Sequence, residues 1–439
     1  MHICILYQYY LRPGDPGFNR FNEYARIWSE QGHKVSVITG QASYMTGVKD
    51  PSYYYRPCIR EQDGEVDVYR MYVPDRANES FFRRSLSYLA FALASAWGYR
   101  KLDRPSVLVC SSPPLLIGLG MLLIHQFSRV PIVFDVRDLW PDTAVTTGFI
   151  HNHHVIRALY GLEWRCYAAA RKLNVLTEAF RENIVARGLV EPSRISFVPN
   201  GVDTRQHRPE LRSERLREEL GWAGRFVVLY SGAHGLANRV VQLVDAAELL
   251  RDRPEILIAT VGAGMDLGPL RGRVRERGLT NIVLHGPRPR DEMPAITASA
   301  DACVAVLQRN DTFRTVYPNK VFDYMASGRP IVLGIDGAAR ELVERAGAGL
   351  YTEPEDPRAL ADALIRLHRD PALAAEMGRR GREFVVQDFD LRQLALRYLA
   401  ELESVVEEAA SDDTKRKSSG RRAKTVERKQ CVLSDGRTG

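Results

Sequence analysis

Hydrophobic positions follow two alternating rhythms along the chain. In the segment 18–31, apolar side chains recur every three or four residues, which is the spacing of one helix face. Apolar runs rich in β-branched residues stand on either side, at 3–9 and at 34–39. Strands of this kind around an amphipathic helix predict a βαβ unit at the start of the chain.

The same alternation continues and then restarts. Further strands are predicted at 106–110, 131–136, 172–176 and 194–198, each beside a helical segment. After a charged, proline-containing stretch that ends near Gly224, strands are predicted at 226–230, 255–261, 281–284, 301–307 and 330–335, with helices at 239–250, 319–327 and 338–346. We therefore predict an α/β protein with two Rossmann-like halves, which would hold a ligand in the cleft between them.

The pattern sets the expected domain boundaries. We expect an N-terminal domain over 1–203, a C-terminal domain over 204–385, a helix over 386–409 that packs back toward the N-terminal domain, and a disordered tail over 410–439. The tail carries nine Lys or Arg against four acids from residue 411 onward. Most of the net charge of +7 therefore lies there, which leaves little support for a nucleic-acid partner. The tail is either a solvated appendage or a tether to anionic lipid.

Composition adds mainly exclusions. The 439 residues are 45% hydrophobic and 26% charged, a mixture typical of soluble enzymes. Six cysteines occur without a CxxC pair, which fits a reducing cytoplasm and disfavours a thiolate metal site. The first residues are expected to form a buried strand rather than a signal peptide, and no apolar stretch is long enough to cross a bilayer.

The segment 317–330 is the most informative for chemistry. Pro318 suits the first turn of a helix, and Gly328 suits its end. Lys320 and Asp323 then lie on one face, three residues apart. A cation beside a carboxylate can serve the diphosphate and the ribose hydroxyls of a nucleotide, although a surface Lys–Asp pair is the simpler interpretation.

Two other loops follow predicted strands and are candidates for the site. The loop 12–17 carries Gly14 and Gly17 ahead of a helix, where backbone N–H groups can receive an anion. Arg137 and Asp138 stand at the carboxyl end of an apolar strand. Each loop also has a structural interpretation, as a tight turn in the first case and as an ion pair that fixes the loop in the second.

Taken together, these motifs resemble a known family. The glycine loop, Arg-Asp-Leu-Trp-Pro, Pro-Asn-Gly-Val-Asp, Tyr-Ser-Gly-Ala-His-Gly and Pro-Asn-Lys…Asp-Tyr-Met-Ala-Ser-Gly-Arg-Pro occur in family order. The chain is similar, over roughly residues 1 to 405, to retaining glycosyltransferases of the GT-B fold, family 4, and more narrowly to the fucosamine-type transferases of O-antigen and capsule assembly.

The resemblance implies an activity and its partners. The expected reaction is a metal-independent and cofactor-independent transfer of a sugar from a nucleotide-sugar, UDP-linked and with an N-acetylated amino sugar as one candidate, to a lipid-linked or oligosaccharide acceptor. The donor would be held mainly by the C-terminal domain and the acceptor mainly by the N-terminal domain. The expected location is the cytoplasm, at the inner-membrane surface. A UDP-sugar epimerase or hydrolase and a non-catalytic nucleotide-sugar-binding protein are the alternatives.

The resemblance also assigns roles to residues. Arg137 and Asp138 would lie near the reacting sugar, and Lys320 would contact the diphosphate. Asp323 would hold the ribose hydroxyls. The residues expected to contact the donor are Gly14, Gly17, Gly232, His234, Arg239, Arg314, Lys320 and Asp323.

Departures from the family pattern affect the donor site. Many relatives carry two glutamates eight positions apart, where this chain has Thr315 and Asp323. The usual Arg and Lys after the first strand of the C-terminal half are replaced by Ala233 and Asn238. Candidates for the missing positive charge are Arg239, Arg314 and Lys320, because a diphosphate left unpaired in a cleft would be costly.

Other motifs favour structural interpretations. Asp388-Phe-Asp390 precedes a helical run, so Asp390 is expected to cap that helix rather than bind a metal. The histidines at 151–154 lack acidic or thiol neighbours at zinc spacing, and Gly262 with Gly264 lacks the third glycine of a dinucleotide site. The segment 81–101 combines aromatic and aliphatic residues with basic ends, which suits an interfacial membrane helix or a core helix equally well.

Overall fold

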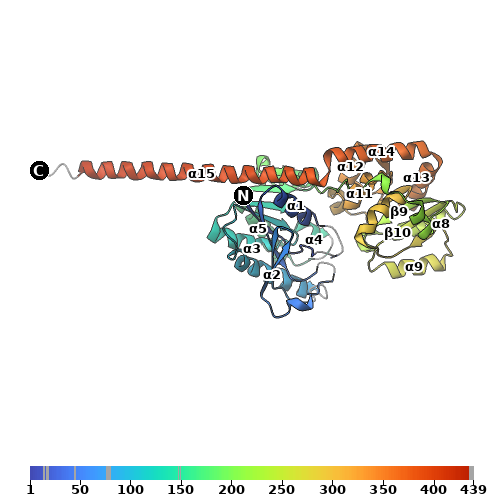
Figure 1. The fold of residues 1–439 in the computed structure, drawn as a ribbon, viewed down its shortest axis with the longest axis horizontal. Helices are drawn as coiled ribbons and strands as arrows, with labels where there is room; N and C mark the ends of the chain where they lie inside the picture. Colours follow the sequence, from blue (N-terminus) through green and yellow to red (C-terminus); the bar gives the residue numbers. More distant parts are fainter. Residues whose placement is uncertain are drawn as a thin grey trace.

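The chain forms two α/β domains joined at a narrow waist (Figure 1). The computed structural model describes residues 1–12, 15, 19–43, 46–75, 81–146, 148 and 150–434, with side chains of 81, 82 and 416–434 left out. Each domain is a sheet covered by helices on both faces, as the hydrophobic pattern predicts. The fold class is α/β with two Rossmann-like domains, as the sequence predicts.

The N-terminal sheet has eight strands in the order β3-β4-β2-β1-β5-β6-β7-β8. Its strands are β1 His2–Leu6, β2 Lys34–Gly40, β3 Cys58–Asp63, β4 Val66–Met71, β5 Val107–Ser112, β6 Ile132–Val136, β7 Lys172–Val175 and β8 Ile195–Phe197. All neighbours are parallel except β3 and β4, which form a hairpin. The carboxyl ends of the parallel strands therefore meet at one edge of the sheet.

Helices cover both faces of this sheet. They are α1 Arg20–Glu30, α2 Phe81–Tyr99, α3 Ile117–Ser128, α4 Asp142–Thr146, α5 His153–Ala169 and α6 Glu178–Ala186. Helix α1 packs on one face, and α2, α3 and α5 contribute to the core on the other. The buried residues that the sequence placed on one side of the first helix, such as Phe21 and Trp28, pack in the core between α1 and the sheet.

The C-terminal sheet has six parallel strands in the order β11-β10-β9-β12-β13-β14. Its strands are β9 Phe226–Ser231, β10 Ile256–Val261, β11 Ile282–Leu284, β12 Ala302–Val306, β13 Ile331–Gly334 and β14 Gly349–Tyr351. Its helices are α7 Glu214–Glu219, α8 Val241–Leu249, α9 Leu267–Glu276, α10 Met293–Ser299, α11 Asn319–Ala326, α12 Ala338–Ala346, α13 Pro357–Arg369 and α14 Pro371–Asp388. Strand order reverses between β9 and β12, the position at which such sheets bind ligands.

The chain crosses between the domains twice, and the two crossings are paired. Val202 N donates to Phe389 O at 3.1 Å, and Leu391 N donates to Val202 O at 3.0 Å. Gly201 permits this approach, because a Cβ there would lie 2.4 Å from Phe389 O. The two linkers are thereby held together as one short connection.

The last helix, α15 Leu391–Ser434, returns along the N-terminal domain (Figure 1). Asp390 caps it, as expected, by accepting from Arg392 N at 3.0 Å and Gln393 N at 3.2 Å. Its apolar side chains, Leu394, Ala395, Tyr398, Leu399, Leu402 and Val405, join the core that α1 covers. The Trp28 indole N–H also donates to Ala395 O at 2.8 Å.

Helix α15 includes residues 410–434, a segment for which the sequence predicted a disordered tail. Helix α15 continues without a break to Ser434 and extends beyond the N-terminal domain (Figure 1). The segment 410–434 contains no proline and a single glycine, and it is rich in Lys and Arg. These are good helix formers, so helix propensity accounts for the continuation.

A buried ion pair joins the parts of the N-terminal domain. The Arg20 guanidinium, at the start of α1, contacts Asp135 on β6, and both side chains are almost fully buried. Arg20 also donates to Val198 O at 3.1 Å, in the first linker. Asp135 accepts from Asn174 of β7 at 2.8 Å and from the Tyr398 hydroxyl of α15 at 3.4 Å. Five separate segments therefore meet at this pair: α1, β6, β7, the first linker and α15.

Removing one charge of the pair should destabilise the folded protein. We expect Asp135→Asn to lower the free energy of unfolding by about 3–5 kcal/mol, because Arg20 would keep a buried charge without its partner. Urea unfolding followed by tryptophan fluorescence checks this, since four of the five tryptophans lie in the N-terminal domain.

The control is an exposed ion pair that also involves α1. Arg392 of α15 contacts Glu30 of α1 at 2.7 Å, at the surface. Arg392→Ala should cost no more than about 1 kcal/mol. Equal losses for the two variants would contradict a special role for the buried pair.

Candidate active site

A cleft of about 550 Å³ opens between the two domains. It lies beyond the carboxyl ends of β9 and β10, where the topology favours a ligand. Its lining comes from both domains and from the linker, and it includes Glu23, Gly201, Asp203, Gln206, His207, Gly232, Gly262, Arg288, Arg290, Asn319, Lys320 and Asp323.

Helix α11 presents Lys320 and Asp323 to this cleft. The helix begins at Asn319, directly after Pro318. Val321, Phe322 and Met325 are buried in the core on its other side. That amphipathic division directs the two charged side chains into the cleft, as the sequence predicted.

The Lys320 amine has an unusual environment. Its Nζ lies 3.9 Å from the centroid of the Tyr230 ring. It is buried and has no hydrogen-bond partner among the described residues. Burial lowers the pKa of Lys320 to about 7, and the nearby Asp323 opposes this shift without cancelling it. No carboxylate of the described residues lies within ion-pair distance of this amine, so an incoming anion would be strongly favoured.

The absence of a side chain at Gly232 leaves space for the Lys320 amine. The backbone at Gly232 has φ +135°, a conformation that other residues rarely adopt. A Cβ on this residue would lie 2.8 Å from Lys320 Nζ. Gly232 therefore lies directly against the amine, and a larger residue would displace it.

Asp323 faces the cleft one turn further along α11. Its Oδ1 lies 3.8 Å from His207 Nε2, and its side chain is 38% exposed. Burial in the cleft raises the pKa of Asp323, while His207, Arg290 and Lys320 act in the opposite direction. The carboxyl oxygens are thus available to accept hydrogen bonds from hydroxyl groups.

His234 lies behind the cleft rather than in it. It is fully buried, and its Nε2 lies 3.0 Å from the Thr260 hydroxyl. Burial, aided by the charge of Lys320, lowers the pKa of this histidine. The side chain fixes the loop after β9, so direct contact with a donor, as expected from the sequence, is not what this structure shows.

Glycines 262 and 264 hold two loops against each other. A Cβ on Gly262 would lie 1.8 Å from Gly232 O, and one on Gly264 would lie 2.2 Å from His234 O. The pair therefore permits close packing of the loops after β9 and β10. This is the structural reason for a glycine pair that does not complete a dinucleotide motif.

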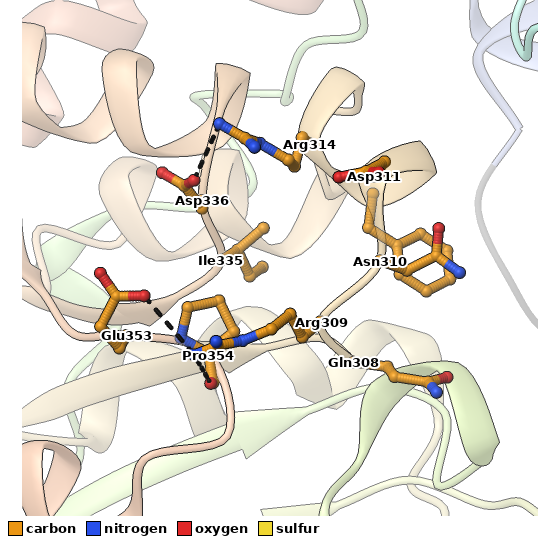
Figure 2. Close-up of a pocket in the computed structure, with 10 residues that line it drawn as sticks. Gln308, Arg309, Asn310, Asp311, Arg314, Ile335, Asp336, Glu353 and Pro354 are labelled. Carbon is orange, nitrogen blue, oxygen red and sulfur yellow. Dashed lines mark hydrogen bonds and ion pairs between the residues drawn. The ribbon is translucent and has the colours of Figure 1, made fainter.

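The structure does not bring Arg239 and Arg314 to the Lys320 cleft. Arg239 is half exposed and pairs with Glu355 at 3.4 Å. Arg314 lines a separate cavity of about 410 Å³ and pairs with Asp336 at 3.1 Å, as Figure 2 shows. Acidic partners already hold both guanidinium groups. The cations that do line the cleft beside Lys320 are Arg288 and Arg290.

Arg137 and Asp138 lie at the interface of the domains but differ in setting. Arg137 follows β6, lies over the Tyr7 ring at 5.2 Å from its centroid, and lines a small cavity together with Asn200 and Tyr317. Asp138 accepts from the Thr143 hydroxyl at 2.7 Å, and burial raises its pKa. Arg137 is thus the better placed of the two to reach a group held between the domains.

Two side-chain hydrogen bonds close the interface around the start of α11. The Asn200 amide donates to Asn319 Oδ1 at 2.8 Å, and the Thr177 hydroxyl donates to Thr315 O at 2.8 Å. The sequence singled out Asn200 only as a member of the Pro-Asn-Gly-Val-Asp motif. It did not point to His207, because it offers no signal there beyond proximity to the Asn-Gly-Val-Asp motif.

Some expectations lie outside what the structure describes. Gly14 and Gly17 fall outside the described residues. Within the described ranges, no group of three or more His, Cys, Asp or Glu side chains is arranged to hold a metal ion. Across the same ranges, no helix combines the length and the apolar character needed to traverse a bilayer.

Comparison with known proteins identifies the family. Residues 19–201 match the family described as glycosyl transferase 4-like domain, and residues 225–370 match glycosyl transferases group 1. The chain belongs to family 4 of the GT-B glycosyltransferases. This membership confirms the family predicted from the motifs, while the narrower likeness to fucosamine-type transferases stays a prediction.

Individual relatives support this family 4 membership. A protein of Escherichia coli K12 assigned to colanic acid biosynthesis as the glycosyl transferase WcaI is 24% identical over 85% of this chain and 92% of its own. The GDP-mannose-dependent alpha-(1-6)-phosphatidylinositol monomannoside mannosyltransferase of Mycolicibacterium smegmatis is 30% identical over 72% of this chain and 87% of its own.

A solved structure shows the same fold. Anabaena HepE in complex with UDP has a TM-score of 0.68 and 18% identity, and the match covers 92% of this chain and all of that one. This glycosyltransferase therefore has the complete two-domain architecture, with Lys320 facing the cleft between its domains.

The lowered pKa of Lys320 predicts a pH-dependent stability. Between pH 7 and the ordinary lysine value of 10.5, the unfolded chain binds more protons at this position than the folded one. The stability of the native protein relative to Lys320→Met should therefore rise with pH between 7 and 9, by at most about 1.4 kcal/mol per pH unit. Urea unfolding of both proteins at several pH values measures this difference.

A charge-retaining variant serves as the control. The guanidinium of Lys320→Arg stays protonated throughout this range, so its difference from Lys320→Met should not depend on pH. A flat difference for the native protein as well would show that the empty cleft leaves the lysine charged.

Proposed function

We propose that this enzyme transfers a sugar, with retention and without a metal ion, from a UDP-sugar to a lipid-linked glycan in cell-surface polysaccharide synthesis. An N-acetylated amino sugar is among the donors to be tested. Membership of a glycosyltransferase family supports the reaction class. The relative assigned to colanic acid biosynthesis supports the polysaccharide context, and the UDP complex of HepE supports the choice of base. The GDP-mannose dependence of the mycobacterial relative makes guanine the base to test against.

One observation carries the proposal: an amine that has no hydrogen-bond partner in the described part of the chain is buried in the interdomain cleft. A diphosphate would supply the counterion that Lys320 lacks. As the bond to the sugar breaks, negative charge builds on the leaving phosphate. A fixed ammonium at that point stabilises the developing charge more than it stabilises the bound donor, which is the requirement for catalysis.

Other residues would position the two substrates. Asp323 would accept hydrogen bonds from ribose hydroxyls, with His207 3.8 Å away to hold it. Arg137 and Asn200, on the opposite side of the interface, would orient the sugar and the attacking hydroxyl. No side chain is assigned as a covalent nucleophile.

The central test removes the amine. We expect Lys320→Ala to lower turnover by at least about 100-fold, because one donor aimed at the leaving group is lost. Turnover is measured as nucleotide release from a panel of UDP-sugars and GDP-mannose, with lipid-linked glycans extracted from the producing cells. Omitting the acceptor separates transfer from hydrolysis or epimerisation.

Lys34→Ala is the matched control for this test. Lys34 is exposed at the start of β2, where it pairs with Asp103 at 2.8 Å, far along the sheet from the cleft. Its loss should leave turnover unchanged. If Lys320→Ala retained near-normal turnover, the assignment of the amine to the diphosphate would be wrong.

An exposed apolar face supports action at a membrane surface. Leu86, Leu89, Leu93 and Trp97 recur along α2, and all four are exposed. Leu123 and Phe127 of the adjoining helix α3 are exposed as well. From residue 81 to 134 the chain carries six Lys or Arg and a single acid, Asp103. An apolar face with a basic surround suits the interface of an anionic bilayer.

Polar substitutions on this face test membrane attachment. Leu89→Ser with Leu93→Ser and Trp97→Ser should abolish flotation with vesicles of phosphatidylglycerol and phosphatidylethanolamine. Leu249→Ser is the control, because Leu249 is equally exposed in the C-terminal domain. Unchanged flotation of the triple variant would remove this part of the proposal.

A further inference from the structure

Exposed tyrosine rings gather at one edge of the N-terminal sheet. Tyr54 and Tyr55 lie in the loop after β2, and Tyr72 lies directly after β4. Tyr54 is 39% exposed, Tyr72 is 47% exposed, and Tyr55 is fully exposed. Because β2 and β4 are parallel neighbours, both loops leave the same edge of the sheet.

The loop after β2 is held firmly from beneath. Tyr53 is buried, and its hydroxyl donates to Glu61 of β3. Asp50 caps the short 3-10 helix Pro51–Tyr53 by accepting from Ser52 N at 2.9 Å, and it pairs with Arg12 at 2.8 Å. These contacts fix the backbone from which the next two tyrosines project.

Tyr55 has a strained backbone. Its φ is +62°, in the left-handed region that a residue with a large side chain seldom occupies. The ring gains no burial in return, since it projects fully into solvent. Strain of this kind, kept without any packing benefit, is typical of residues that bind something.

Asp75 connects the two loops. It accepts from the Tyr54 hydroxyl at 2.7 Å and from Lys49 N at 2.9 Å. The Lys49 amine in turn lies 3.9 Å from the centroid of the Tyr72 ring. Polar groups on this surface thus link Tyr54 to Tyr72, and the Tyr55 ring lies beside Tyr54, with their centroids 6.4 Å apart.

We propose that this tyrosine platform, formed by Tyr54, Tyr55 and Tyr72, binds a sugar of the acceptor glycan. The C–H face of a pyranose packs on an aromatic ring, and its hydroxyls need hydrogen-bonding groups around the rim. Asp75 and Arg56 provide such groups beside the rings. The proposal rests on the proposed function in requiring that the acceptor is a glycan.

The position of the platform defines the length of that acceptor. Arg137, at the reaction side, follows β6, which lies three strands away from β2 in the sheet. Neighbouring strands are about 4.8 Å apart and Tyr72 follows β4, one strand beyond β2, so the platform lies roughly 14–19 Å from that point along the edge. This exceeds one sugar ring, so a platform sugar and the reacting sugar would belong to one short oligosaccharide.

Saturation-transfer NMR tests the platform directly. The probes are methyl α-D-mannopyranoside, methyl β-D-galactopyranoside, methyl α-L-fucopyranoside and N,N′-diacetylchitobiose, with irradiation of the aromatic protons. We expect transfer to ring C–H protons of at least one probe. The signal should fall about fivefold in Tyr55→Gly with Tyr72→Ala, because ring contact is lost. Glycine adopts a positive φ freely, so this change at residue 55 does not threaten the fold.

Three further measurements make the result decisive. Trp164→Ala removes a ring that is just as exposed on α5 and should leave the transfer unchanged. UDP binding by calorimetry should be equal in the native protein and the double variant, and its absence from both would contradict the proposed function rather than the platform. The platform proposal is overturned if no probe receives saturation, if the double variant retains it, or if that variant loses only vesicle flotation.

Discussion

The buried contact between Arg20 and Asp135 is the constraint on which the two-domain arrangement depends. A charge without water must be matched by an opposite charge and by hydrogen bonds, and this pair meets both conditions. The pair joins α1 to β6, and its further hydrogen-bond partners come from β7, from the linker at Val198 and from Tyr398 of α15. The pair therefore fixes the point from which the chain leaves the N-terminal domain and the helix by which it returns.

Lys320 is also buried, but its charge is left without a hydrogen-bond partner among the described residues. The Arg20 guanidinium donates to the Asp135 carboxylate and to Val198 O. The amine of Lys320 instead meets an aromatic face and the backbone of Gly232, with no hydrogen-bond acceptor in the part of the chain that the structure describes. The first arrangement stabilises the folded chain, and the second costs stability. An unpaired buried cation of this kind is typical of a site where a ligand supplies the missing charge, which is the role that the proposed function gives to Lys320.

The sequence predicted the repeating strands and helices of both domains well, because parallel strands buried on both faces give continuous apolar runs. It missed the hairpin of β3 and β4, although Asp63-Gly64 is a turn signal between alternating residues. In the site, helix periodicity was enough to predict that Lys320 and Asp323 share one face of a helix, and this face lines the cleft. Periodicity could not predict where the side chains of Arg239 and Arg314 point. The direction of a long side chain in a loop depends on which acidic residue lies nearby in the folded structure.

The positive charges of the cleft are not equivalent, and this determines which one a diphosphate engages. Arg290 lies 3.5 Å from Glu23 of α1, and Arg288 lies 3.7 Å from Glu292. An anion would have to compete with those carboxylates for either guanidinium. Lys320 has no such competitor among the described residues. A bound anion would offset the loss of solvation that burial imposes on its ammonium group. A chain that lacks the family's usual phosphate-binding pair can therefore rely on one lysine, because its environment makes that lysine the most favourable partner for an anion.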